Sequence, residues 1–138
     1  MWSFVLLQAF HKNERGKLME YTSLTKSFEF SRAYRRGKAF VHPWLVTYVF
    51  KRKSGGLRIG VTASKKTGNA VARNRARRVV KAAIQRCFLQ NVAETGFSGV
   101  SYDIVFVVRG ATALKKSYEI KAVMKNHLIE AGVLQNGK

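Results

Sequence analysis

Residues 65–81 read KKTGNAVARNRARRVVK, and this stretch predicts a long amphipathic helix around which the rest of the fold is arranged. We expect the helix to span residues 69–91, because its apolar side chains recur at close to the 3.6-residue period of an α-helix. The lone cysteine of the chain, Cys87, lies in this pattern, and we interpret it as a small buried thiol. The apolar face that is expected to pack on a sheet consists of Ala72, Ala76, Val79, Val80, Ala83, Ile84, Cys87 and Phe88.

The opposite face of the predicted helix is basic. Arg73, Arg77 and Lys81 are spaced four residues apart and therefore form one stripe along the helix. Guanidinium groups bind phosphates bidentately, and the backbone N–H groups at a helix N-terminus also favour an anion. We interpret Asn74, which lies between two arginines, either as a cap for the preceding loop or as a hydrogen-bond partner of a base edge. The pattern indicates a binding site for a polyanion.

The charge of the whole chain supports this interpretation. Its 138 residues contain 26 Lys and Arg against 7 Asp and Glu, which gives a formal net charge of +19. Between Glu29 and Glu94 the sequence has no Asp or Glu, so all of its charged residues there are Lys or Arg. A merely solvated helix face usually carries Glu partners one turn away, so the missing acids favour nucleic acid as the partner. The charge pattern alone leaves RNA and DNA open, including a DNA-binding module with the helix in a major groove.

Segments on either side of the basic helix predict an α+β fold, a two-layer sandwich with the element order α-β-β-β-α-β-α. We expect strands 45–51 and 57–64 to pair as a hairpin, because Ser54, Gly55 and Gly56 between them are turn residues. Strand 102–109 is nearly continuous in apolar residues and is expected to be buried on both faces. The expected helices are 23–36, 69–91 and 117–131, and the expected strands are 39–41, 45–51, 57–64 and 102–109.

The length of the chain fits one domain, which we place at residues 23–132. Residues 1–22 are expected to be a disordered or weakly docked extension, and residues 133–138 a C-terminal tail. The apolar start of the chain is too short to span a bilayer and lacks the basic region of a signal peptide. We therefore expect a cytoplasmic protein without membrane contact, and the sequence identifies no protein partner.

A nuclease active site within the protein itself is not expected. Two-metal nucleases need clustered carboxylates, but Asp103 is the only Asp, and the Glu residues are scattered outside the basic region. His11, His42 and His127 fall in a tail, a turn and a helix, without the spacing of a metal site or an acid–base pair. We predict no catalytic residue and no metal bound by the protein alone.

The string GNAVARNR at 68–75 resembles the signature of the bacterial ribonuclease P protein subunit. The similarity continues upstream through RIGVTASKK at 58–66 and FSRAYRRG at 30–37, and downstream through DIVFVVR at 103–109. It covers residues 23–128, and several motifs agree in order and spacing. The resemblance implies a ribosomal-protein-S5-like fold with a left-handed β-α-β crossover around the basic helix.

The resemblance also implies a function. Proteins of this family assist a catalytic RNA in the endonucleolytic removal of the 5′ leader from precursor tRNA, which gives the mature tRNA 5′ end. It implies an endoribonuclease subunit whose RNA partner carries the catalysis and binds most of the Mg²⁺. The residues implied to bind the catalytic RNA are Lys65, Lys66, Asn69, Arg73, Asn74, Arg75, Arg77, Arg78 and Lys81. A leader cleft between the first helix and the sheet is implied for Phe30, Tyr34 and Tyr48, with Arg32 and Arg58 as phosphate contacts.

The aromatic residues of the first helix are consistent with such a cleft. Phe30 and Tyr34 are four residues apart and share a helix face, whereas Phe28 points elsewhere and is expected in the core. A base that stacks on an exposed aromatic ring gains about 1–3 kcal/mol, largely independent of sequence. Taken singly, each ring would be expected in the core, and it is the resemblance that favours the cleft role for the pair. The alternative function is a ribosomal or other structural RNA-binding protein without an enzymatic role.

Overall fold

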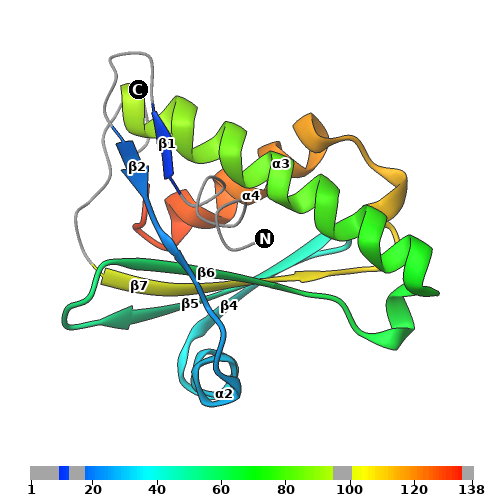
Figure 1. The fold of residues 1–138 in the computed structure, drawn as a ribbon, viewed down its shortest axis with the longest axis horizontal. Coiled ribbons are helices and arrows are strands. Elements are labelled where there is room, and N and C mark those ends of the chain that lie inside the picture. The colour runs from blue at the N-terminus through cyan, green and yellow to red at the C-terminus, as the bar shows by residue number, and fades with distance from the viewer. Residues whose placement is uncertain (1–9, 13–17, 95–100, 135–138) are drawn as a thin grey trace.

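The computed structural model describes residues 10–12, 18–94 and 101–134, and its centre is a five-stranded mixed sheet (Figure 1). The strand order is β3-β6-β7-β5-β4. These strands are β3 (Thr22–Ser23), β4 (Lys38–His42), β5 (Leu45–Arg52), β6 (Leu57–Thr62) and β7 (Ser101–Val108). The helices are α2 (Ser27–Arg36), α3 (Ala70–Glu94) and α4 (Ser117–Glu130), with short 3₁₀ helices η1 (Lys65–Thr67) and η2 (Thr112–Leu114).

The expected order of helices and strands is confirmed, but the predicted pairing of β5 with β6 is wrong. β7 lies between them, and Val105 of β7 has Tyr48 of β5 on one side and Gly60 of β6 on the other. β7 runs parallel to β6 and antiparallel to β5, while β4 and β5 form the hairpin. β7 is the most apolar strand, so a central position removes both of its faces from water. The edge strand β3, which pairs in parallel with β6, was not predicted.

Helices cover both faces of the sheet. Figure 1 shows α3 and α4 on one side of it and α2 on the other. The sheet and the α3–α4 layer form the expected two-layer sandwich, and α2 adds a cover over part of the opposite face. β6 and β7 are parallel neighbours joined through α3, which places the basic helix in the crossover connection.

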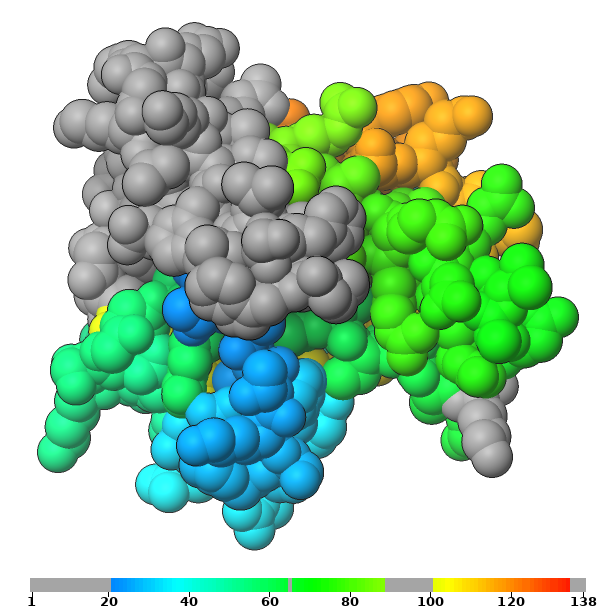
Figure 2. Space-filling model, in the orientation of Figure 1, coloured from blue at the N-terminus to red at the C-terminus, as the bar shows by residue number. Residues whose placement is uncertain are grey.

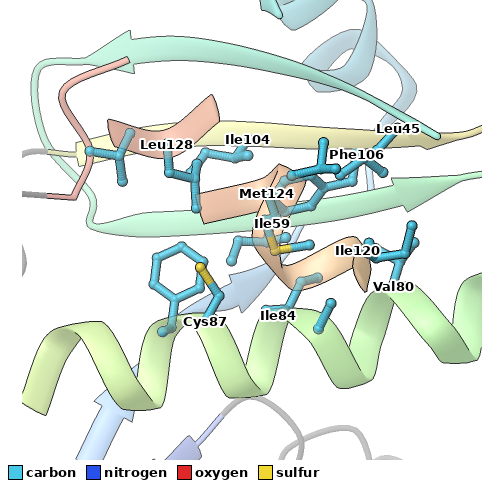
Figure 3. Packing of buried hydrophobic residues seen from close by; sticks show 14 of the residues in the cluster. Leu45, Ile59, Val80, Ile84, Cys87, Ile104, Phe106, Ile120, Met124 and Leu128 are labelled. Carbon is cyan, nitrogen blue, oxygen red and sulfur yellow. The ribbon is translucent and has the colours of Figure 1, made fainter. Parts of the chain in front are cut away.

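The main core lies between the sheet and the α3–α4 layer (Figure 3). Sheet residues such as Ile104 and Phe106 meet Ile84 of α3 and Met124 of α4, and all four are at most 2% exposed. The predicted apolar face of α3 is confirmed: Ala76, Val80, Ala83, Ile84, Cys87 and Phe88 are buried, and Ala72 and Val79 are half-buried. Burial raises the pKa of the Cys87 thiol to about 12, which agrees with its interpretation as a structural thiol.

The ends of the domain depart slightly from the expected boundaries. Val133 and Leu134 belong to the buried core, so the packed region extends two residues beyond 132. Within the predicted N-terminal extension, β1 (Phe10–Lys12) and β2 (Leu18–Glu20) pair as an antiparallel ribbon. The rest of the extension (1–9 and 13–17), most of the predicted loop (95–100) and the last residues (135–138) lie outside the described residues. Across the described ranges, none of the helices has the length and apolarity needed to cross a membrane.

Candidate functional site

The start of α3 is fixed by local hydrogen bonds. Asn69 caps the helix, since its Oδ1 accepts the Ala72 backbone N–H at 2.9 Å. The preceding residue, Gly68, has φ = +139°, a conformation that other residues rarely adopt. Asn74 does not cap the loop; its Oδ1 accepts a hydrogen bond of 3.2 Å from Arg77 on the helix surface. Capping is therefore a function of Asn69.

The predicted RNA-binding residues lie together on α3 and the turn before it. Lys65 belongs to η1, immediately before the helix. Arg73 and Arg77 are half-buried at the border with the core, and the Arg73 guanidinium donates to the Gly68 carbonyl at 2.9 Å. The exposed members are Lys66, Asn69, Asn74, Arg75, Arg78 and Lys81. Figure 2 shows this N-terminal part of α3, in green, as a projection separate from α2, in blue.

A buried ion-pair cluster occupies the α2 side of the sheet. Asp103 of β7 is fully buried and accepts from Arg52 Nε at 2.6 Å and from Arg58 Nε at 2.7 Å. Arg32 Nη2 of α2 reaches the same carboxylate at 3.1 Å, and Arg58 Nη1 pairs with the buried Glu29 at 2.5 Å. The cluster thus connects α2 to β5, β6 and β7.

The electrostatics of this cluster favour the ionised carboxylate. Burial alone would raise the pKa of Asp103, but hydrogen bonds from Arg58 and Arg32 and the charge of Arg52 outweigh it and lower the pKa. The hydrogen bond to Asp103 in turn raises the pKa of Arg58. Three guanidinium groups meet two carboxylates, which leaves one excess positive charge.

Arg32 and Arg58, predicted as phosphate contacts, are both members of this cluster. Arg58 uses three nitrogens on Asp103 and Glu29, so most of its donors are already engaged. Arg32 stays 29% exposed and stacks over the Phe50 ring at 4.8 Å. Arg52 and Glu29, which were not predicted as site residues, are the other members of this ion-pair cluster. The available signal was a lone Asp inside an apolar strand, which needs buried cations to stay charged.

The predicted aromatic residues meet on the same side of the sheet. The rings of Tyr34 and Tyr48 are 5.0 Å apart in an edge-to-face arrangement, and the Tyr34 hydroxyl lies 3.3 Å from Thr62 Oγ1. Phe30 is half-buried against Gly60, where an added Cβ would lie 2.6 Å from its ring. Phe28 was expected in the core but is 59% exposed, because α2 turns Glu29 and Ala33 inward instead.

The aromatic surface and the basic helix are neighbours along the chain. Thr62, which contacts Tyr34, ends β6, and the basic turn η1 begins three residues later at Lys65. Tyr34 therefore contacts the end of β6, and the chain continues from there directly into the basic turn that precedes α3.

Two histidines that are distant in the sequence are neighbours in the fold. His42 and His127 lie close together, with 6.5 Å between ring centroids, a pair that their spacing in the sequence does not indicate. His127 bonds Thr47 Oγ1 at 2.8 Å, and burial, then the charge of His42, lowers its pKa. In the described part of the chain, no group of three or more His, Cys, Asp or Glu is placed to hold a metal ion.

Comparison with known proteins gives a consistent result. The family model described as "Ribonuclease P" matches residues 18–132. The "Ribonuclease P protein component" of Clostridium kluyveri is 36% identical over 115 residues, covering 83% of this chain and 98% of its own. That of Clostridioides difficile is 38% identical over 103 residues, covering 75% and 85% of the two chains.

Solved structures of similar fold agree with these sequence matches. The RNase P protein of Staphylococcus aureus superposes with a TM-score of 0.63 at 26% identity, covering 82% of this chain and 97% of its own. The RNase P protein of Thermotoga maritima has a TM-score of 0.60 at 20% identity, covering 78% and 96%, and shows the shared fold.

Proposed function

Because the chain belongs to the family of bacterial ribonuclease P protein subunits, we propose that its two candidate surfaces bind two different RNAs. As a member of this family it is the protein component of an endoribonuclease that processes the 5′ end of tRNA, in partnership with the ribonuclease P RNA. In the proposal, the basic side of α3 binds the catalytic RNA and the Tyr34–Tyr48 surface binds the leader of precursor tRNA. A purely structural RNA-binding role is not favoured.

The observation that supports the first surface is the continuous positive charge of α3. From Lys66 to Lys81 the described surface of the helix carries exposed cations and no carboxylate. Cations of this kind neutralise phosphates and release counterions, which gives affinity without sequence readout. A folded RNA presents such a phosphate surface, and the Asn69 cap keeps the first turn of the helix in place.

The second surface is supported by the exposed aromatic pair. Tyr34 is 40% exposed while its ring lies edge-to-face with that of Tyr48, so part of the Tyr34 side chain is accessible to a base. Stacking tolerates any base, which suits leaders of varied sequence. Phe30 contributes less in this proposal, because its ring already packs on Gly60. Arg32, 29% exposed at the edge of the ion-pair cluster, is the better placed of the two arginines for a phosphate.

We also propose that the RNA subunit binds the Mg²⁺ of the reaction. The basic groups of α3 would lower the repulsion between two RNAs and so help them to hold that metal. The same proposal places the protein in the cytoplasm, with precursor tRNA as its second partner.

Reconstitution with the cognate catalytic RNA tests the function as a whole. We expect the protein to increase cleavage of precursor tRNA most strongly at low Mg²⁺, and no increase would refute the proposal.

The leader surface is tested separately with Tyr34→Ala. This variant should weaken binding of precursor tRNA with a long leader and leave binding of mature tRNA unchanged. Phe28→Ala is the matched control, because Phe28 is an exposed ring of the same helix outside the Tyr34–Tyr48 pair. Equal losses for both tRNAs would remove Tyr34 from the leader site.

A further inference from the structure

A pocket of about 320 Å³ lies between α3 and the edge of the sheet formed by β3 and β6. Its inner wall is apolar, with Ile59 and Val61 of β6 and Ile84 of α3. Phe30 of α2 also lines the pocket, as does Tyr21, the residue just before β3. The volume falls at the lower end of the range typical of small-molecule sites.

The outer side of the same pocket is cationic. Arg77 and Lys81, one helical turn apart on α3, both line it, and Gln85 follows one turn later with a side-chain amide. Among the described lining residues there is no Asp or Glu. The pocket therefore combines an apolar interior with an entrance suited to phosphate and a group able to hydrogen-bond a base edge.

We propose that this pocket receives one unpaired nucleotide of the catalytic RNA, with the base inside and its phosphates on Arg77 and Lys81. An unpaired base offers an aromatic surface that can enter an apolar site, and its backbone supplies the anions that the entrance attracts. This inference rests on the proposed binding of the catalytic RNA to α3.

The position of the pocket selects the catalytic RNA over the leader as the source of that nucleotide. Arg77 and Lys81 belong to the basic stripe of α3, on the main-core side of the sheet. The Tyr34–Tyr48 pair, which carries the proposed leader surface, lies on the other side, with α2. Phe30, whose ring packs on Gly60 at the edge of the sheet, is the one predicted leader residue that lines the pocket. A nucleotide held by the stripe therefore comes from the RNA that runs along α3.

Residue 23 offers a site-specific probe of the pocket. Ser23 is exposed and lines the pocket, whereas its neighbour Thr22 is exposed and does not. Successive strand residues point to opposite faces, so Thr22 is a matched control one residue away. Cys87 is buried with a pKa raised to about 12, so the variants Ser23→Cys and Thr22→Cys each add one readily modified thiol.

The experiment attaches a photoreactive aryl azide to each thiol and reconstitutes the full chain with the catalytic RNA and precursor tRNA. We expect S23C to crosslink to one discrete unpaired nucleotide of the catalytic RNA, and T22C to give no such product. Crosslinks to the leader, to residues 1–20 of the protein, or to no RNA in a holoenzyme that still cleaves would overturn the inference. A protein that fails to stimulate cleavage would instead refute the proposed function.

A second measurement fills the pocket. Ser23→Trp should weaken binding of the catalytic RNA about tenfold, because one stacked base is displaced, while Thr22→Trp should bind as the wild type does. Both variants are first shown to unfold at the wild-type denaturant midpoint. Equal affinities for the two variants would contradict occupancy of the pocket.

Discussion

The arginines of α3 and those on the α2 side of the sheet are the same residue type in opposite settings. On the α2 side, Arg52 and Arg58 converge on a buried Asp103, and Arg32 completes the set. On α3, Arg75 and Arg78 are exposed on a surface without carboxylates. The position of a few acids therefore divides the positive charge into a structural part and a part available for RNA.

The largest effect is expected from removing the acid that defines this division. Asp103→Ala should lower the free energy of unfolding by about 3–5 kcal/mol, because three guanidinium groups would lose their shared buried partner. Urea denaturation measures the change, and Arg75→Ala on α3 should alter stability by less than about 0.5 kcal/mol. Equal stabilities for the two variants would show that the arginines around Asp103 contribute no more to stability than those of α3.

Packing next to the cluster provides the second prediction. Gly60→Ala would place a Cβ 2.6 Å from the Phe30 ring, so the ring, α2 or β6 must shift. We expect a loss of about 1–3 kcal/mol in unfolding free energy. The double variant Gly60→Ala with Phe30→Leu should recover part of that loss, and no recovery would locate the strain elsewhere.

The salt dependence of RNA binding tests whether the exposed arginines of α3 contact phosphates. Arg75→Ala should reduce the slope of log affinity against log salt by about 0.7–0.9, the share of one phosphate contact. Lys53 is an exposed cation in the loop that connects β5 to β6, so Lys53→Ala is the control and should leave the slope unchanged. Filter binding of the catalytic RNA over a salt series measures both, and an unchanged slope for the Arg75 variant removes this residue from the interface.

The smallest effect concerns pH. Because the pKa of Asp103 is lowered in the folded protein, its contribution to stability is complete above the ordinary Asp pKa of about 3.9 and is lost as the pH falls through the lowered value. Lowering the pH from about 7 to 5 should therefore change this contribution little. Urea midpoints at a series of pH values give the profile, and Asp103→Asn should lack the Asp103 part of the fall at acidic pH.

The sequence predicted the helices and strands well wherever the signal is local. The apolar period of α3 depends only on neighbouring turns, and Ala76, Val80 and Cys87 are buried as expected. Strand pairing depends on distant segments, and the turn residues between β5 and β6 suggested a hairpin that β7 prevents. β3 has two residues, too few for any periodic pattern.

The candidate site was predicted less completely than the fold. A motif identified the residues of α3, but a count of charges could not separate Arg52 and Arg58 from the arginines that face solvent. That separation depends on the distant partners Asp103 and Glu29. The roles of the predicted RNA-binding and leader-binding residues, the S5-like likeness and the hand of the crossover stay predictions.

The central position of β7 has a consequence for synthesis on the ribosome. The strands β5 and β6 leave the ribosome before β7, and each can pair only with its outer neighbour, β4 or β3, until β7 enters between them. Until then β6 and α3 lack the strand that joins them to the β4–β5 hairpin, and their apolar surfaces stay open to the solvent. Non-local sheets of this kind form slowly and expose aggregation-prone edges. The nascent chain is therefore most in need of chaperone protection between the release of β6 and the release of β7.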